Sequence, residues 1–195
     1  MIPSMTRIKP TGKRAAFWIP LMLACLLAGP APAQLFGSSD VLIEATRKGN
    51  LEEMRAALLQ GYRVDDRGRD KVPPLVIAAE NGHLEAVEFL LAKGAKPFIK
   101  SFDDRTALSA AVFSGRIDIV QVLLNAHADP NQLGPQRETP LLIATRAHNT
   151  DIVALLLSHG ADPEATDLTG RTALQIAEER RLDDIRLLLS GAGGS

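Results

Sequence analysis

The sequence predicts an all-α solenoid of five helix-turn-helix units with a period of 33 residues. Two series of residues carry this prediction, because each recurs at that interval without an insertion or a deletion. The leucine series comprises Leu42, Leu75, Leu108, Leu141 and Leu174, and the alanine series comprises Ala45, Ala78, Ala111, Ala144 and Ala177. A fixed period of about 20 to 50 residues is typical of solenoids, in which each unit exposes an apolar face that only its neighbours can cover.

The N-terminus has the three regions of a secretory signal peptide over residues 1–33. Four basic residues without an acid precede an apolar run from Ala15 to Gly29, and Ala31-Pro32-Ala33 offers a cleavage site before Gln34. We therefore expect cleavage after Ala33. A retained membrane anchor is one alternative, but the run of about 15 apolar residues is shorter than the roughly 20 that a bilayer requires. Lipidation at Cys25 is another, although the apolar run continues past that residue.

Removal of this segment changes the charge balance of the chain. The 22 basic residues fall to 18 against 23 acidic ones, a net charge of about −5, and the single cysteine is removed as well. A cysteine-free chain suits an oxidising export compartment without disulfides, so the sequence predicts a periplasmic or secreted protein. An acidic chain argues against nucleic acid as a partner, because phosphates require clustered Lys and Arg.

Residues 34–39 are expected to form a flexible leader, because this short stretch of small and polar residues buries little surface. The repeat domain is expected at 40–190, with a frayed tail at 191–195. Its units are expected at about 38–70, 71–103, 104–136, 137–169 and 170–190. In the first unit a helix from Val41 to Lys48 turns at Gly49-Asn50, and a second helix returns to Gly61. Its many charged residues predict an N-terminal cap with a solvated outer side.

The second unit opens at Pro73-Pro74-Leu75, and proline suits a first helical turn because its missing N–H would have no partner there. After a turn at Gly82-His83, leucine and valine recur at three- and four-residue spacing up to Leu91, which predicts a one-sided helix. Gly94 ends that helix. The fourth unit repeats this order, from Thr139-Pro140-Leu141 to Gly160-Ala161-Asp162.

These motifs together resemble the ankyrin repeat: Thr-Pro-Leu then Ala, Gly-His at the turn, Val-x-x-Leu-Leu, and Gly-Ala-Asp-Pro. The best matches are Leu75 to Ala95 and Thr139 to Asp162, and the resemblance covers Asp40 to about Leu189. It implies two antiparallel helices and a short β-hairpin loop in each unit, stacked so that a concave groove faces a protein partner.

The sequence departs from the family pattern at several positions. The histidine that follows Thr-Pro-Leu in the family is replaced by Val76, Ser109, Leu142 and Gln175. The turn glycine seen at Gly49, Gly82 and Gly115 becomes His148 and then Arg181, and His127 stands where Gly61, Gly94 and Gly160 occur. A left-handed turn at each non-glycine residue costs on the order of 1 kcal/mol. We therefore expect the C-terminal half to be the less stable one.

The last unit is expected to be a polar C-terminal cap. Thr172-Ala173-Leu174 and Ile176-Ala177 keep the pattern, whereas the second helix, Asp183 to Leu189, is expected to lie one residue out of step with the earlier copies. A run of charged residues between them makes this unit polar.

The sequence predicts neither a catalytic nor a metal site, and no cofactor. The four histidines, His83, His127, His148 and His159, occupy turns or helix ends of successive units rather than one constellation. The paired acids Asp103-Asp104 and Asp183-Asp184 fall where solvated residues are expected, and no glycine-rich phosphate loop occurs.

If the ankyrin geometry holds, the loop tips and the exposed face of each first helix are free to bind a partner. The predicted partner-binding residues are Arg69, Phe102, Asp103, Arg105, Phe113, Gln136, Glu138 and Arg146, with Asp70, Val72, Ser114, Leu168 and Arg171 as further free positions. Aromatic residues flanked by arginines are common anchors of protein interfaces. Phe98 is expected to pack between a loop and a helix instead.

The leading hypothesis is therefore a non-enzymatic, exported module that binds a folded protein. It implies no small-molecule substrate, and the membrane is involved only through the signal sequence. The alternative is an accessory or protective subunit of an exported redox or haem enzyme, with His127 or His159 touching the cofactor. A small enzyme is the third hypothesis.

Overall fold

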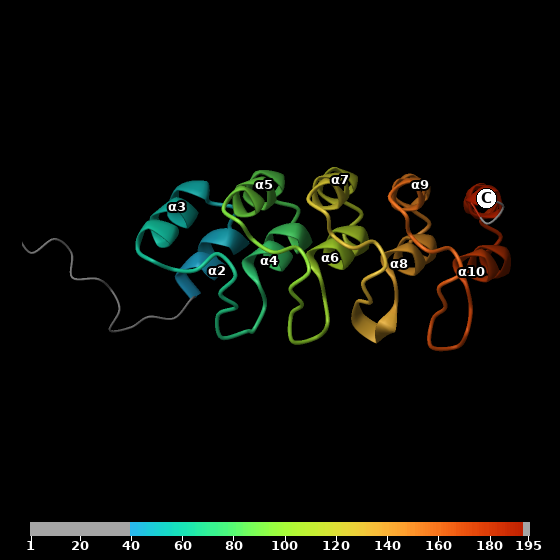
Figure 1. The fold of residues 1–195 in the computed structure, drawn as a ribbon, viewed down its shortest axis with the longest axis horizontal. Helices are drawn as coiled ribbons and strands as arrows, with labels where there is room; N and C mark the ends of the chain where they lie inside the picture. Colours follow the sequence, from blue (N-terminus) through green and yellow to red (C-terminus); the bar gives the residue numbers. More distant parts are fainter. Residues whose placement is uncertain (1–39, 193–195) are drawn as a thin grey trace, which may run out of the picture. The chain divides into compact units, whose positions relative to one another are not determined.

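The computed structural model describes residues 40–192, so the expected signal peptide, cleavage site, leader and most of the tail lie outside the described residues. These residues form ten α-helices in five consecutive pairs (Figure 1). The pairs are α2 (Asp40–Arg47) with α3 (Leu51–Leu59), α4 (Pro74–Glu80) with α5 (Leu84–Ala92), α6 (Ala107–Phe113) with α7 (Ile117–Asn125), α8 (Pro140–Arg146) with α9 (Thr150–Ser158), and α10 (Ala173–Arg180) with α11 (Asp183–Ala192). None of these helices is long and apolar enough to cross a membrane.

The pairs stack side by side, which confirms the predicted solenoid. The first helices of the units lie in one row and the second helices in another, and the loops between units project from the row of first helices (Figure 1). Each first helix contacts the first helices of its neighbours, as in α4 with α6 and α6 with α8, and each second helix does the same. The loops and the first helices therefore share one exposed face of the stack, and the second helices form the opposite one (Figure 1).

Threonines cap most of the first helices. Thr106 Oγ1 accepts a hydrogen bond from Ser109 N at 3.0 Å, and Thr172 Oγ1 accepts one from Gln175 N at 3.3 Å. In return Ser109 Oγ accepts from Thr106 N at 2.9 Å, and Gln175 Oε1 accepts from Thr172 N at 3.0 Å. These reciprocal pairs are capping boxes. Two of the residues that replace the family's histidine, Ser109 and Gln175, thus accept a hydrogen bond from the residue that caps the helix.

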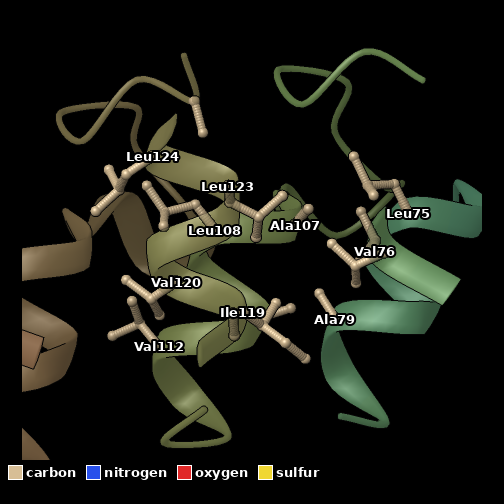
Figure 2. Packing of buried hydrophobic residues seen from close by; sticks show 14 of the residues in the cluster. Leu75, Val76, Ala79, Ala107, Leu108, Val112, Ile119, Val120, Leu123 and Leu124 are labelled. Carbon is tan, nitrogen blue, oxygen red and sulfur yellow. The ribbon is translucent and has the colours of Figure 1, made fainter. Parts of the chain in front are cut away.

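The two series of the sequence line the core. The alanines at 78, 111, 144 and 177 are fully buried, so adjacent first helices approach closely. Figure 2 shows how side chains of the third unit divide between its neighbours: Ile119 points toward the second unit, whereas Val112 and Val120 point the other way. All three are buried.

Both ends of the stack are polar where the central units are apolar, as expected for caps. Exposed Glu53 takes the position of Ile119 in the first unit, and exposed Arg186 takes the position of Val120 in the last. The prediction that the final helix is out of step is wrong, because buried Ile185 and Leu189 keep the 33-residue spacing. The polar Arg186 obscured this register in the sequence.

The left-handed turns are confirmed at the glycines and at the residues that replace glycine. The turn after the first helix has φ of 67° at Gly49 and 72° at Gly82, and this conformation is kept at His148 with 54° and Arg181 with 57°. His127 likewise has φ of 60° after α7. These residues adopt a conformation that disfavours a side chain. The lower stability expected of the C-terminal half stays a prediction.

The loops between units are closed by a backbone hydrogen bond at a repeating position. Ser101 N donates to Arg105 O at 2.9 Å, Gly134 N to Glu138 O at 2.8 Å, and Asp167 N to Arg171 O at 2.9 Å. Within residues 40–192 the loops contain only one isolated β-bridge, Thr166 with Thr172, and no extended strand. They are therefore hairpin-like turns rather than regular β-hairpins.

Candidate partner-binding face

One position in the last turn of each first helix defines the chemistry of the exposed face. The residues that recur there are Arg47, Glu80, Phe113, Arg146 and Glu179. Four of them are charged and form ion pairs with residues of the loops: Arg47 with Asp70, Glu80 with Arg105, Arg146 with Asp167, and Glu179 with Arg171. Phe113 alone is apolar, and 82% of it is exposed. The row of ion pairs is thus interrupted in the central unit.

A hollow of about 690 Å³ lies around this phenylalanine, and we call it the Phe113 hollow. Its apolar part includes Ala110 and Phe113 of α6 together with Ile143 of α8 and Ala147 beyond it. Its remaining lining residues are Glu80, Asp103, Arg105, Ser109, Pro135, Gln136, Glu138 and Arg146. Six of the eight residues predicted from the sequence to bind a partner therefore meet in one place.

The other two predicted residues line a neighbouring hollow of about 580 Å³, the Phe102 hollow. Exposed Phe102 and Arg69 lie there, together with Arg47, Asp70, Lys71, Val72, Ile77, Glu80, Asn81 and Arg105. Glu80 and Arg105 line both hollows. Their ion pair, with 2.5 Å between Arg105 Nη1 and Glu80 Oε1, therefore forms a shared wall.

Arg105 is held from two sides. Besides the contact with Glu80, its Nε donates to Asp103 Oδ2 at 2.7 Å, and Ser101 Oγ donates to the other Asp103 oxygen. Burial acts to raise the pKa of Asp103, but the Ser101 hydrogen bond and the Arg105 charge outweigh it and hold this pKa below its ordinary value. Asp103 therefore remains ionised, and the Arg105 side chain is fixed in place.

Arg146 is also held by two carboxylates in the next unit, but its buried Nε makes no hydrogen bond. Its Nε lies 3.0 Å from Glu138 Oε1, and its Nη2 donates to Asp167. Asp167 is buried and also accepts from Arg171 and Thr169. The hydrogen bond from the Thr169 hydroxyl is the largest cause that lowers the pKa of Asp167, followed by the backbone N–H of Arg171. This buried carboxylate thus anchors the loop against α8.

Two residues of this face differ from the sequence-based expectation. Val72 is buried and so is not a free position, because it packs into the core beside the loop. Phe98 is more than half exposed, so the expectation that it packs between a loop and a helix is wrong. Leu168, expected to be free, is exposed.

Two residues that organise the face were missed. Glu80 lies 33 residues before Phe113, and the period alone was a sufficient signal to find it. Asp167 gave no such signal, because the equivalent positions in earlier units hold Ser101 and Gly134.

The histidines lie apart, as the sequence predicted. His83 Nε2 is 3.0 Å from Arg47 O, His148 Nε2 is 3.3 Å from Asp184 Oδ1, and His159 Nδ1 is 2.9 Å from Leu155 O. His127 is exposed after α7. In the part of the chain that the structure describes, no group of three or more His, Cys, Asp or Glu residues is arranged to hold a metal ion.

Stacked helix pairs whose loops and first helices form an extended exposed face define a repeat protein that presents a surface to a macromolecule. The family model for ankyrin repeats (3 copies) matches residues 42–133 and 126–194. The chain therefore belongs to the ankyrin-repeat family, and its role is that of a protein–protein interaction module. Such repeats are typically non-enzymatic. No curated protein matches the chain.

Proposed function

We propose that this ankyrin-repeat domain binds a folded protein through the Phe113 hollow, with the Phe102 hollow as a second contact. The observation that supports the proposal best is Phe113 itself: a large aromatic side chain, 82% exposed, stands where the other units carry a paired charge. Folding of the domain gives no reason for an aromatic side chain at this position, whereas burial against a partner does.

The energetics favour this use of the face. Burying an exposed phenylalanine side chain contributes roughly 1.5 to 3 kcal/mol. Phe113 is one such side chain and Phe102 is another. Arg105 and Arg146 are already ordered by ion pairs on either side of Phe113, so a partner that contacts them loses little side-chain entropy on binding.

Site-specific photo-crosslinking tests the proposal. A benzoylphenylalanine introduced at position 113 is expected to crosslink a defined protein, which mass spectrometry identifies and which is then purified for binding measurements. The matched control is position 59 on α3, where Leu59 is 89% exposed on a second helix. Crosslinking of the same protein at both positions, or at neither, would contradict the proposal.

We also propose that the protein acts in the periplasm after cleavage between Ala33 and Gln34. The support comes from the basic, apolar and small-residue regions of the N-terminus, which lie outside the described residues. Cell fractionation followed by N-terminal sequencing is expected to find a periplasmic chain that begins at Gln34. A chain that keeps Met1, or one that begins with a lipidated Cys25, would overturn this assignment.

A further inference from the structure

We propose that the partner segment seated in the Phe113 hollow is basic as well as apolar, with a Lys or Arg side chain beside the apolar one. This inference rests on the proposed function and adds the chemistry of the partner. Four features of the hollow carry it: the balance of its charges, the exposure of those charges, their hydrogen-bonding capacity, and the aromatic ring of Phe113.

Acidic groups outnumber basic groups around the hollow. Its lining contains the carboxylates of Glu80, Asp103 and Glu138 against the guanidinium groups of Arg105 and Arg146. Arg137 precedes Glu138 and is exposed, but it is not one of the lining residues. A cation that enters the hollow is therefore attracted by the net charge of its wall.

The two carboxylates that bind Arg105 are more exposed than the guanidinium groups. The exposed fraction of the side chain is 44% for Glu80 and 36% for Asp103, against 28% for Arg105 and 27% for Arg146, whereas the third carboxylate, Glu138, is 16% exposed. Each arginine is already bound by two carboxylates of this chain.

The hydrogen-bonding capacity of these groups points the same way. A carboxylate has two oxygens that accept about four hydrogen bonds, so Glu80 can bind an incoming donor and keep its contact with Arg105. The guanidinium group of Arg105 already donates through Nε and Nη1 to two carboxylates, so an acidic partner would place a third negative group beside them. The hollow is therefore better prepared for a basic segment than for an acidic one.

Phe113 adds a third attraction. Its side chain is exposed and lines the hollow together with Glu80 and Asp103. The face of an aromatic ring attracts Lys and Arg within about 6 Å, and neighbouring carboxylates reinforce that attraction. The methylene groups of the same cationic side chain can pack on Ile143 and Ala147.

Selection from a displayed library of random peptides tests the inference. The mature chain is the bait, and Phe113→Ala is used in parallel to identify sequences that depend on the hollow. We expect Phe113-dependent peptides to place Lys or Arg within two or three positions of an aliphatic or aromatic residue, at a frequency well above that of the library.

Two other outcomes overturn the inference. Phe113-dependent peptides without an excess of Lys and Arg would refute the basic partner and leave the proposed function standing. A selection that yields no Phe113-dependent peptide would refute the inference too, while the crosslinking experiment at position 113 decides the proposed function separately.

Charge variants provide the second readout on a selected, synthesised peptide. Glu80→Gln is expected to weaken binding by about two- to fivefold, which is the usual range for a partly exposed ion pair. The loss should shrink in about 1 M salt, because screening weakens such contacts. Glu52→Gln, at an exposed position of α3, is the matched control and should leave the affinity unchanged. Equal affinity for Glu80→Gln and the original chain would contradict the inference.

Discussion

Truncation of one repeating leucine in two different units tests whether the units stabilise each other by stacking. Leu141 and Leu174 occupy the same position of α8 and α10. Leu141 is buried between units on both sides, whereas Leu174 is only partly buried, because no described unit follows the last one. The two side chains are therefore chemically identical, and they differ only in whether a described unit follows their own.

The structure sets the expected magnitudes. Leucine to alanine removes three carbon atoms, each worth about 0.8 kcal/mol when fully buried, and the cavity left at position 141 adds to that loss. We expect Leu141→Ala to lower the free energy of unfolding by about 3 kcal/mol. At position 174 solvent already reaches the side chain, so we expect Leu174→Ala to lower it by about 1 kcal/mol.

Urea denaturation followed by circular dichroism at 222 nm measures both losses. Tryptophan fluorescence does not serve here, because the only tryptophan, Trp18, lies in the expected signal peptide. Leu59→Ala on the surface of α3 is the control and should change the stability by less than about 0.5 kcal/mol. Equal losses at positions 141 and 174, or a loss below about 1 kcal/mol at position 141, would refute the stacking argument.

Two further predictions concern strain and pH. Arg181 is exposed with φ of 57°, so Arg181→Gly should raise the free energy of unfolding by about 1 kcal/mol. Arg180→Gly, at the last residue of α10, should lower it, because glycine disfavours the helix and the hydrogen bond from Arg180 to Arg146 O is lost. Urea denaturation distinguishes the two signs. The pKa of Asp167 is lower in the folded chain than the value of about 3.9 in an unfolded one. The stability that the ionised Asp167 adds to the folded chain is therefore complete above about pH 5. It is lost as the pH falls below about 4 toward the pKa of Asp167 in the folded chain. Stability measured between pH 7 and 3 should show that the difference between the original chain and Asp167→Asn narrows below about pH 4; a constant difference would contradict this.

The sequence was sufficient to predict the stacking, because the 33-residue period is a local and repeated signal. It placed the alanines between helices and the left-handed turns at His148 and Arg181, since each position is fixed by its equivalents in other units. Six of the partner-binding residues predicted from the sequence line the Phe113 hollow, because loop tips and first-helix ends share one face in this architecture.

The parts that could not be predicted depend on contacts between residues that lie far apart in the sequence. The ion pair of Glu80 with Arg105 joins residues 25 positions apart, and that of Arg146 with Asp167 joins residues 21 apart. Which carboxylate a given arginine binds is decided by how each loop folds back onto the next helix. The exposure of Phe98 depends on the same loop geometry, and composition carries no information about it.

The most direct test of the account uses the partner that crosslinking identifies, purified on its own. It measures the affinity of that partner for Phe113→Ala and for Leu59→Ala. Both changes remove an exposed apolar side chain, but only Phe113 lies in the proposed binding face. We predict that Phe113→Ala weakens binding by at least about tenfold, as for an interface anchor, and that Leu59→Ala stays within about twofold of the original chain. An unchanged affinity for Phe113→Ala would contradict the assignment of this face as the binding surface.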